Sequence, residues 1–304
     1  MVLATPTGQL HGSLRLPAGA DAAPAVPVAL IVAGSGPTDR DGNSAALPGT
    51  NDSLKMLADA LAELGVASLR YDKRGIGQSA AAAPPESEMT FDLLVDDAVG
   101  WLEALAGDAR FGPRVVVGHS EGSLIGMLAT RRAGADAFVS LEGAGRRAAD
   151  VLRGQLAAQL PAALLAEIDT VLAELEAGRL VPRLPPGIAA VPGVGQALFR
   201  DSVQPYLVSW FRLDPAQAIG ELDVPCLIVQ GSTDLQVTSS DAERLADAAR
   251  TGTLASIEGM NHVLKAAPAD RAANLATYTD PAAPLADGLT QALRGFLERA
   301  LPAS

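Results

Sequence analysis

The sequence has a single cysteine and only three histidines in 304 residues. One cysteine excludes an internal disulfide framework and any cysteine-rich metal site. Cys226 lies in the apolar run 225–229, which predicts a buried strand, so we expect its thiol to pack in the core rather than to react. The scarcity of histidine is useful in another way, because a catalytic base can be sought among few candidates.

Positive charge is also scarce, since the formal net charge at pH 7 is −12. This balance argues against binding to nucleic acid, which calls for basic patches, and against binding to anionic membrane surfaces. Apolar runs are too short to span a bilayer. The N-terminus lacks a basic segment followed by an apolar core, so it predicts no signal peptide and a cytoplasmic location.

Hydrophobic content of 48% and charged content of 19% are typical of a globular chain. Its length suits one large α/β domain with an insertion, or two modest domains. Apolar runs at 28–33, 66–71, 114–118 and 137–141 alternate with helical patterns. That alternation predicts a mostly parallel, doubly wound sheet. Residues 4–16 alternate loosely around Gly8 and predict an antiparallel hairpin ahead of it.

The alternation stops after Gly143, and residues 144–220 show only helical patterns. Strand patterns return at 225–230 and 253–257, and a last helix is predicted at about 285–301. We therefore expect an α/β core formed by 1–143 and 221–304, with 144–220 inserted as a helical cap. A cap is favoured because ligands of open α/β sheets bind outside the carboxyl ends of the strands.

The stretch from Gly118 to Gly122 matches the Gly-x-Ser-x-Gly pattern of a nucleophile elbow, with Ser120 at its centre. A strand that turns sharply into a helix strains its apex residue and crowds the residues two positions away on either side. Glycine at 118 and 122 fits that crowding. The pattern therefore predicts Ser120 as a nucleophile at the N-terminal end of a helix.

A serine nucleophile needs a base, and the base needs a carboxylate partner. His119 lies inside the elbow and His11 in the N-terminal hairpin, which leaves His262, after the last strand, as the expected base. Asp234 follows a strand at the catalytic edge of the sheet. Other acids lie before that strand or inside the next helix, so Asp234 is the expected third member (the rejected acids are Glu221, Asp223 and Asp241).

An oxyanion on the substrate requires two backbone N–H donors. We expect one from Glu121, which follows the nucleophile, and the other from Ser35 in the loop after the first buried strand. The side chain of Glu121 suits the first turn of a helix. Charged residues of the two neighbouring loops are expected mainly to form local salt bridges and turn hydrogen bonds (Asp39, Arg40, Asp41, Asn43, Asp72 and Arg74).

These residues resemble the α/β-hydrolase superfamily, and within it bacterial carboxylesterases of the EstD type in the serine-aminopeptidase-like branch. The matching blocks are 34–43, 71–79, 118–122, 230–234 and 259–265, and they occur in the family's order. The resemblance implies a cofactor-free esterase, with no metal, that favours short acyl chains. One departure is Ala33-Gly34, where many relatives have His-Gly in the oxyanion loop.

The predicted function is hydrolysis of small-molecule carboxylic esters, with short- to medium-chain acyl groups, through an acyl-enzyme on Ser120. The alternatives are an acyl thioesterase or an aminopeptidase with the same triad, or a non-hydrolytic ligand-binding homologue. An aminopeptidase would need a carboxylate to hold the free amine, for which Glu142 is a candidate. The oligomeric state is left open, a homodimer being one option.

Overall fold

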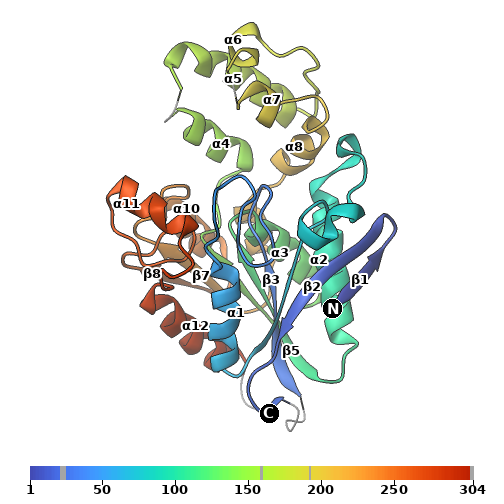
Figure 1. Ribbon diagram of the computed structural model, residues 1–304, viewed down its shortest axis with the longest axis vertical. Helices are drawn as coiled ribbons and strands as arrows, with labels where there is room; N and C mark the ends of the chain where they lie inside the picture. Colours follow the sequence, from blue (N-terminus) through green and yellow to red (C-terminus); the bar gives the residue numbers. More distant parts are fainter. Residues whose placement is uncertain (21–24, 158–159, 192, 302–304) are drawn as a thin grey trace.

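Eight strands form one sheet within the residues that the computed structural model describes, namely 1–20, 25–157, 160–191 and 193–301 (Figure 1). Their order across the sheet is β1-β2-β4-β3-β5-β6-β7-β8. The strands are β1 Val2–Thr5, β2 Gly8–Arg15, β3 Val26–Val32, β4 Ala67–Tyr71, β5 Phe111–His119, β6 Ala137–Leu141, β7 Cys226–Gly231 and β8 Gly252–Ile257.

Strands β1 and β2 form an antiparallel hairpin, and β2 pairs antiparallel with β4. All other neighbours in the sheet are parallel. The carboxyl ends of β3 to β8 therefore lie along one edge. Together with the structural relatives described below, this topology confirms the predicted mostly parallel sheet with an N-terminal hairpin.

Helices connect the parallel strands and cover both faces of the sheet. The α-helices are α1 Ser53–Glu63, α2 Phe91–Ala106, α3 Glu121–Ala133, α4 Ala148–Ala157, α5 Ala162–Glu176, α6 Pro186–Ala189, α7 Gly195–Leu198, α8 Gln204–Phe211, α9 Pro215–Gly220, α10 Ser239–Ala248, α11 Arg271–Ala276 and α12 Asp287–Ala300. Short 3₁₀ helices are η2 Gly77–Ala82, η3 Glu86–Glu88 and η4 Thr277–Thr279. Helix α2 begins at Phe91 because the Thr90 hydroxyl accepts a hydrogen bond from the Leu93 N–H.

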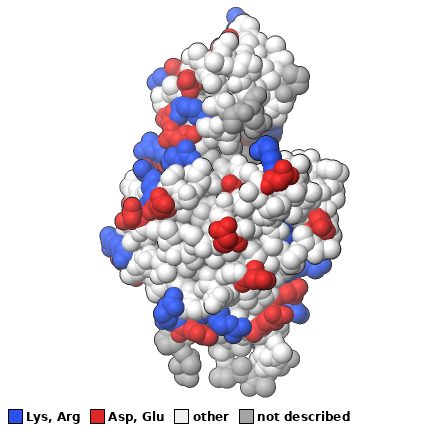
Figure 2. All heavy atoms as spheres, turned by 90° about the vertical axis from the view of Figure 1, so that its left-hand side faces the viewer, with Lys and Arg blue, Asp and Glu red and all other residues white. Residues whose placement is uncertain are grey.

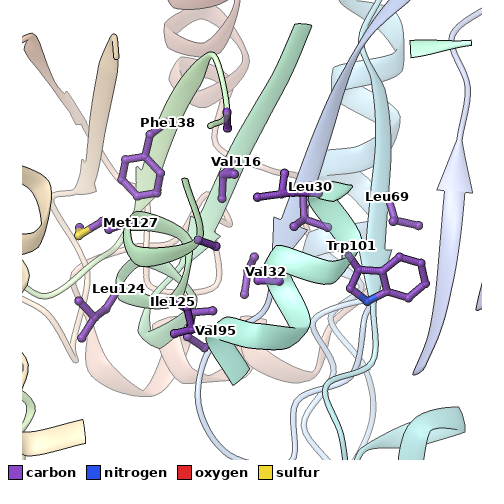
Figure 3. Close-up of a cluster of buried hydrophobic side chains, with 14 of the residues drawn as sticks. Leu30, Val32, Leu69, Val95, Trp101, Val116, Leu124, Ile125, Met127 and Phe138 are labelled. Carbon is purple, nitrogen blue, oxygen red and sulfur yellow. The ribbon is translucent and has the colours of Figure 1, made fainter. Parts of the chain in front are cut away.

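The core divides between the two faces of the sheet because successive side chains of a strand point to opposite sides. Leu30 and Val32 of β3 pack in one cluster with side chains of α2 and α3, as Figure 3 shows for Trp101 and Ile125. Ile31 faces the other way, into a cluster that α1 and α12 complete. Burial of each such side chain stabilises the fold by roughly 1.5–3 kcal/mol. The two apolar layers therefore hold the strands, and the loops at their ends, in fixed positions.

Helices α4 to α9 follow one another between β6 and β7. In Figure 1 helices α4 to α8 lie together above the sheet. They share an apolar cluster of their own, which includes Ile168, Leu172, Phe199 and Phe211. Among the described helices none combines the length and hydropathy that crossing a membrane requires.

Figure 2 shows acidic and basic side chains scattered over a face that is mainly uncharged. Exposed ion pairs of the protein include Arg132–Asp96 and Arg250–Asp223. Asp97, next to Asp96 on α2, is different. Its carboxylate accepts a 2.7 Å hydrogen bond from Arg74 Nε, and both side chains are only 3% exposed. Arg74 lies in the loop after β4, so this buried pair ties that loop to α2.

Replacing Asp97 with alanine should lower the free energy of unfolding by about 3–5 kcal/mol, because it leaves the Arg74 guanidinium buried without its partner. Asp96→Ala is the matched control on the same helix. It removes an exposed pair and should cost no more than about 1 kcal/mol. Urea denaturation of both variants measures the difference, and equal losses would contradict a structural role for the buried pair.

Candidate active site

The turn at Ser120 joins β5 directly to α3. Strand β5 ends at His119 and α3 begins at Glu121, so Ser120 is the N-cap residue with φ 53° and ψ −120°. This conformation is sparsely populated by residues other than glycine and costs about 1–3 kcal/mol. The Ser120 N–H donates to the carbonyl of Leu141 at the end of β6, at 2.9 Å. The strained serine is thereby held at the positive end of a helix.

Close backbone packing explains the two glycines of the elbow. A Cβ on Gly118 would overlap the backbone of Gly122, and a Cβ on Gly122 would overlap the carbonyl of Val32 at the end of β3. The turn is therefore pressed against the loop that follows β3. A Cβ on Gly34 in that loop would lie 3.1 Å from the Ser120 Cβ.

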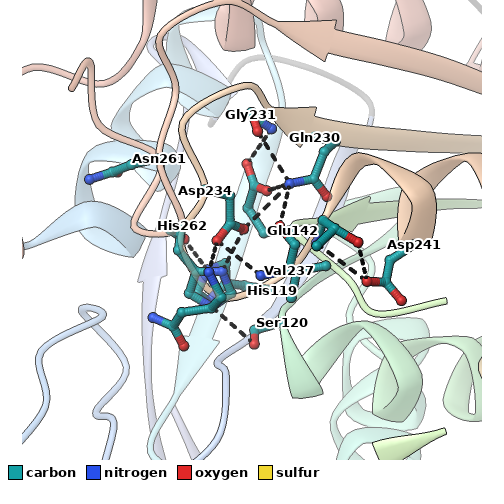
Figure 4. A network of polar contacts seen from close by, with 12 residues as sticks. His119, Ser120, Glu142, Gln230, Gly231, Asp234, Val237, Asp241, Asn261 and His262 are labelled. Atoms are coloured by element: carbon teal, nitrogen blue, oxygen red, sulfur yellow. Dashed lines mark hydrogen bonds and ion pairs between the residues drawn. The ribbon is translucent and has the colours of Figure 1, made fainter. Parts of the chain in front are cut away.

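The structure brings Ser120, His262 and Asp234 together although they follow three different strands (Figure 4). His262 Nε2 lies 3.1 Å from the Ser120 Oγ, and His262 Nδ1 lies 2.8 Å from Asp234 Oδ2. A carboxylate only accepts, so the Nδ1 carries the proton and the Nε2 lone pair faces the serine hydroxyl. This is the geometry in which imidazole can take a proton from serine.

Asp234 is held as an anion. Burial by itself would raise the pKa of Asp234, but its electrostatic interaction with His262 and the hydrogen bonds from His262, Glu142 and the Gln236 N–H lower that pKa by a larger amount. Asp234 Oδ1 accepts from the N–H groups of Gln236 and Val237, at 2.6 and 3.1 Å. The net effect places the pKa of Asp234 well below its usual range.

His119 supports the loop that carries the base. Its Nε2 donates a 2.7 Å hydrogen bond to the backbone carbonyl of His262, and the two rings lie 5.0 Å apart. Burial, together with the charge of His262, lowers the pKa of His119 to about 4. His119 therefore stays neutral while it positions His262. The sequence analysis predicted a base other than His119, but it had no signal for this contact.

The backbone N–H groups of Ser35 and Glu121 donate to no acceptor within the described part of the chain. Lys73, after β4, connects these two positions. Its Nζ donates to the carbonyl of Gly34 at 2.6 Å and to Glu121 Oε2 at 2.7 Å. In a trans peptide the C=O and the next N–H point in opposite directions. Because Lys73 binds the Gly34 carbonyl, the Ser35 N–H of the same peptide group points away from the Lys73 ammonium.

The loop between β3 and α1 is held by side-chain contacts. Arg40 pairs with Asp72 at 2.6 Å, and Asp41 pairs with Arg70 at the same distance. Asp39 Oδ1 accepts from the N–H groups of Asp41 and Asn43. These residues form the local ion pairs and turn hydrogen bonds expected for them, as does Arg74 through Asp97.

A cavity of about 500 Å³ opens beside Ser120. Ser35, Lys73 and Glu121 lie at its core end. The opposite wall comes from α4, α7 and α8 and is mainly apolar (Val151, Leu152, Leu198, Leu207, Trp210 and Phe211). Tyr206 of α8 also lines it and donates a hydrogen bond to Glu121. Burial, with the nearby charge of Glu121, raises the pKa of Tyr206, so its hydroxyl remains a donor.

Glu142 does not line this cavity. It is fully buried behind Asp234, where it accepts hydrogen bonds from the Gly231 N–H and the Gln230 side chain. One ligand atom from each of Glu142, Asp234 and His262 lies within 4.8 Å of the others, which is a spacing that a metal ion could use. Here those atoms already hydrogen-bond within the protein. Sequence reasoning placed Glu142 near the insertion, but had no means of pairing it with Asp234.

Comparison with known proteins gives a matching family model and a curated relative. The family model described as "Serine aminopeptidase, S33" matches residues 49–181. Esterase EstD of Thermotoga maritima is 28% identical over 234 residues, which cover 77% of this chain and 52% of EstD. The chain thus spans about half the length of this curated relative.

Solved structures share the fold over nearly the whole chain. Est1E from Butyrivibrio proteoclasticus, solved with ferulic acid bound, aligns with a TM-score of 0.63 at 18% identity and covers all of both chains. Proline iminopeptidase from Mycobacterium smegmatis aligns with a TM-score of 0.61 at 17% identity, over 99% of this chain and 98% of its own. The chain has the α/β-hydrolase fold and is similar to EstD.

The buried neutral His119 should make the protein less stable in acid. The pKa of His119 is lower in the folded state than the ordinary 6.5, so stability is fully present above pH 6.5 and falls as the pH drops toward 4. The shift corresponds to about 3 kcal/mol over this window. His119→Gln keeps a side-chain donor for the His262 carbonyl and should lose that part of the acid sensitivity.

Urea denaturation of the wild type and the variant at a series of pH values between 7 and 4 checks this, on a two-state analysis. His11→Gln, in the N-terminal hairpin, is the control and should keep the wild-type dependence. Parallel curves for the wild type and His119→Gln would show that His119 is not the group responsible.

Proposed function

We propose that this α/β-hydrolase, similar in sequence to EstD, is a serine carboxylic ester hydrolase. The observation that carries the proposal is the continuous set of hydrogen bonds from Asp234 through His262 to Ser120, at the floor of a largely apolar cavity. The esterase names of EstD and Est1E support the same activity.

In the proposed reaction Ser120 Oγ attacks the ester carbonyl while His262 Nε2 takes the hydroxyl proton. His262 then gives that proton to the departing alcohol, which leaves an acyl group on Ser120. Water, activated by His262, releases the acid in the second half of the cycle. Asp234 stabilises the imidazolium that forms in each half, and its low pKa keeps it charged for that task.

The tetrahedral intermediates carry a negative oxygen, for which we propose the N–H groups of Ser35 and Glu121 as donors. Among the described residues neither N–H donates to another acceptor, which supports this assignment. Lys73 acts as a brace, because it contacts the Gly34 carbonyl on one side and the Glu121 carboxylate on the other. The departure at Ala33-Gly34 leaves both backbone donors in place.

Residues 144–220 serve, in this proposal, as a cap that forms the acyl or alcohol pocket. Leu207, Trp210 and Phe211 line the cavity, while Ile168 lies in the insertion's own core and does not line it. The volume of about 500 Å³ exceeds what an acetyl group requires. Short- to medium-chain acyl esters are therefore the proposed substrates. The cytoplasmic location stays a prediction.

The aminopeptidase alternative also draws support, from the family model and from proline iminopeptidase. It requires a carboxylate that is free to bind the amine of a peptide. Glu86 and Glu121 line the cavity, but Glu86 pairs with Arg200 and Ser202, and Glu121 with Lys73 and Tyr206. Glu142 lies outside the cavity wall. These contacts favour a neutral ester over a charged peptide.

Ser120→Ala should lower the kcat for a p-nitrophenyl ester by about 10⁴-fold or more, because the nucleophile is lost. A fluorophosphonate probe should label the wild type at one serine and leave this variant unlabelled, as mass spectrometry of the intact protein would show. Ser123→Ala, in the same helix but outside the cavity, should still be labelled. Undiminished turnover by Ser120→Ala would refute the proposal.

A substrate panel tests the choice of ester. The kcat/KM for p-nitrophenyl esters should rise from acetyl to butanoyl to hexanoyl, since each buried methylene contributes about 0.8 kcal/mol. An aminoacyl-p-nitroanilide should be at least about 100-fold poorer, because both carboxylates among the described cavity residues, Glu86 and Glu121, are already paired. Faster cleavage of the anilide or of an acyl thioester than of the best ester would favour the corresponding alternative.

A further inference from the structure

A second carboxyl group lies buried beside the triad. Glu142 is 0% exposed and follows the end of β6, whereas Asp234 follows the end of the neighbouring strand β7. The backbone of Glu142 has φ 51°, an uncommon value for a residue with a long side chain. The chain thus accepts strain in order to direct this side chain inward, under the base.

The contacts of Glu142 lead to Asp234 (Figure 4). Glu142 Oε1 accepts from the Gly231 N–H at 2.8 Å, and Oε2 accepts from Gln230 Nε2 at 2.6 Å. The same Gln230 nitrogen lies 3.4 Å from Asp234 Oδ2, the oxygen that also binds His262. The side-chain amide of Gln230 therefore contacts both Glu142 and Asp234, and Asp234 also contacts the imidazole of His262.

One of the two carboxyl groups, Glu142 or Asp234, must carry a proton. Neither carboxyl forms an ion pair with a lysine or arginine among the described residues, and the Asp234 side chain is 1% exposed. His119, which faces His262, is neutral, and Tyr278 is a neutral neighbour. Two adjacent buried carboxylates cannot both stay ionised beside a neutral imidazole. Asp234 binds the Nδ1–H of His262, so the proton belongs on Glu142.

The pKa values agree with that assignment. Burial, followed by the charge of Asp234 and a hydrogen bond with it, raises the pKa of Glu142 well above its usual range. The pKa of Asp234 moves in the opposite direction. The two environments keep one acid neutral and the other charged at the same pH, which is a common device in active sites.

Building on the proposed ester hydrolysis, we propose that Glu142 is a positioning residue of the triad that also serves as a reserve acid. As a neutral acid it donates a hydrogen bond to Asp234 and holds that carboxylate toward His262. Where Asp234 is removed, Glu142 loses the negative neighbour that keeps it protonated. It then ionises and becomes the partner of His262 Nδ1.

Two substitutions at Asp234 should differ in activity, with the alanine variant more active than the asparagine variant. Asp234→Asn keeps an amide between Glu142 and His262, which blocks the reserve acid and favours the wrong tautomer, so kcat should fall by about 10⁴-fold. Asp234→Ala vacates that space, and Glu142 needs only a short movement to reach the ring. The alanine variant should therefore be at least ten times more active than the asparagine variant.

The double variant identifies the source of that activity. Glu142→Gln alone should lower kcat by about three- to tenfold, since glutamine still donates to Asp234. In the Asp234→Ala background the same change should cost 100-fold or more, because glutamine cannot take the place of a carboxylate. Equal losses in the two backgrounds would reduce Glu142 to a structural role and overturn the proposal. Thermal unfolding of every variant verifies that it is folded.

A measurement independent of turnover separates this inference from the proposed function. The Nδ1–H of a histidine bonded to a carboxylate gives a far-downfield proton NMR signal. That signal should appear in the wild type, persist in Asp234→Ala and vanish in the double variant. Loss of the signal in Asp234→Ala would refute the reserve acid, whatever the hydrolytic rates. Absence of ester turnover by a wild type that shows the signal would instead refute the proposed function.

Discussion

The close approach of two backbone segments at the elbow is the constraint on which the site depends. Gly122 lies so near the carbonyl of Val32 that no side chain fits between them. That packing fixes the start of α3 against the end of β3, and therefore fixes Ser120 against the loop that contains Ser35. A strained φ of 53° at Ser120 is tolerated because the surrounding sheet and helix determine it.

Lys73 and Tyr206 extend this constraint to parts of the chain that the elbow does not touch. Lys73 binds the carboxylate of Glu121 and the carbonyl of Gly34, so a single ammonium group joins the two loops beside the nucleophile. Tyr206, from α8 of the insertion, binds the other oxygen of the same carboxylate. The side chain of Glu121 is thus more than a favourable charge at a helix terminus. It links the strand loops, the helix and the insertion at one point.

The sequence alone was sufficient for the features that follow from local patterns. Apolar runs and their alternation with helices predicted the sheet, and the positions of Asp234 and His262 after their strands placed both at one edge. It was insufficient where contacts depend on three-dimensional packing. Lys73 occurs in a recognisable block, but nothing in its spacing reveals a contact with Gly34. Tyr206 lies in a helical stretch without a motif. Glu142 was only a candidate to hold a peptide amine at the start of the insertion, because its strand end was known and its burial was not.

Each acid around Ser120 is bound to a partner within the protein or keeps its proton, and this has a consequence for the cavity. Glu121 pairs with Lys73 and accepts a hydrogen bond from Tyr206, Asp234 accepts the Nδ1–H of His262, and the raised pKa of Glu142 keeps its own proton in place. Because these carboxyl groups already interact with partners inside the protein, they attract a charged substrate into the cavity only weakly. The cavity offers a ligand an apolar wall and two backbone N–H groups, beside polar side chains that include Gln155 and Gln236. A neutral carbonyl compound with an apolar substituent matches that surface, and it gains the N–H contacts most strongly when its carbonyl oxygen becomes negative.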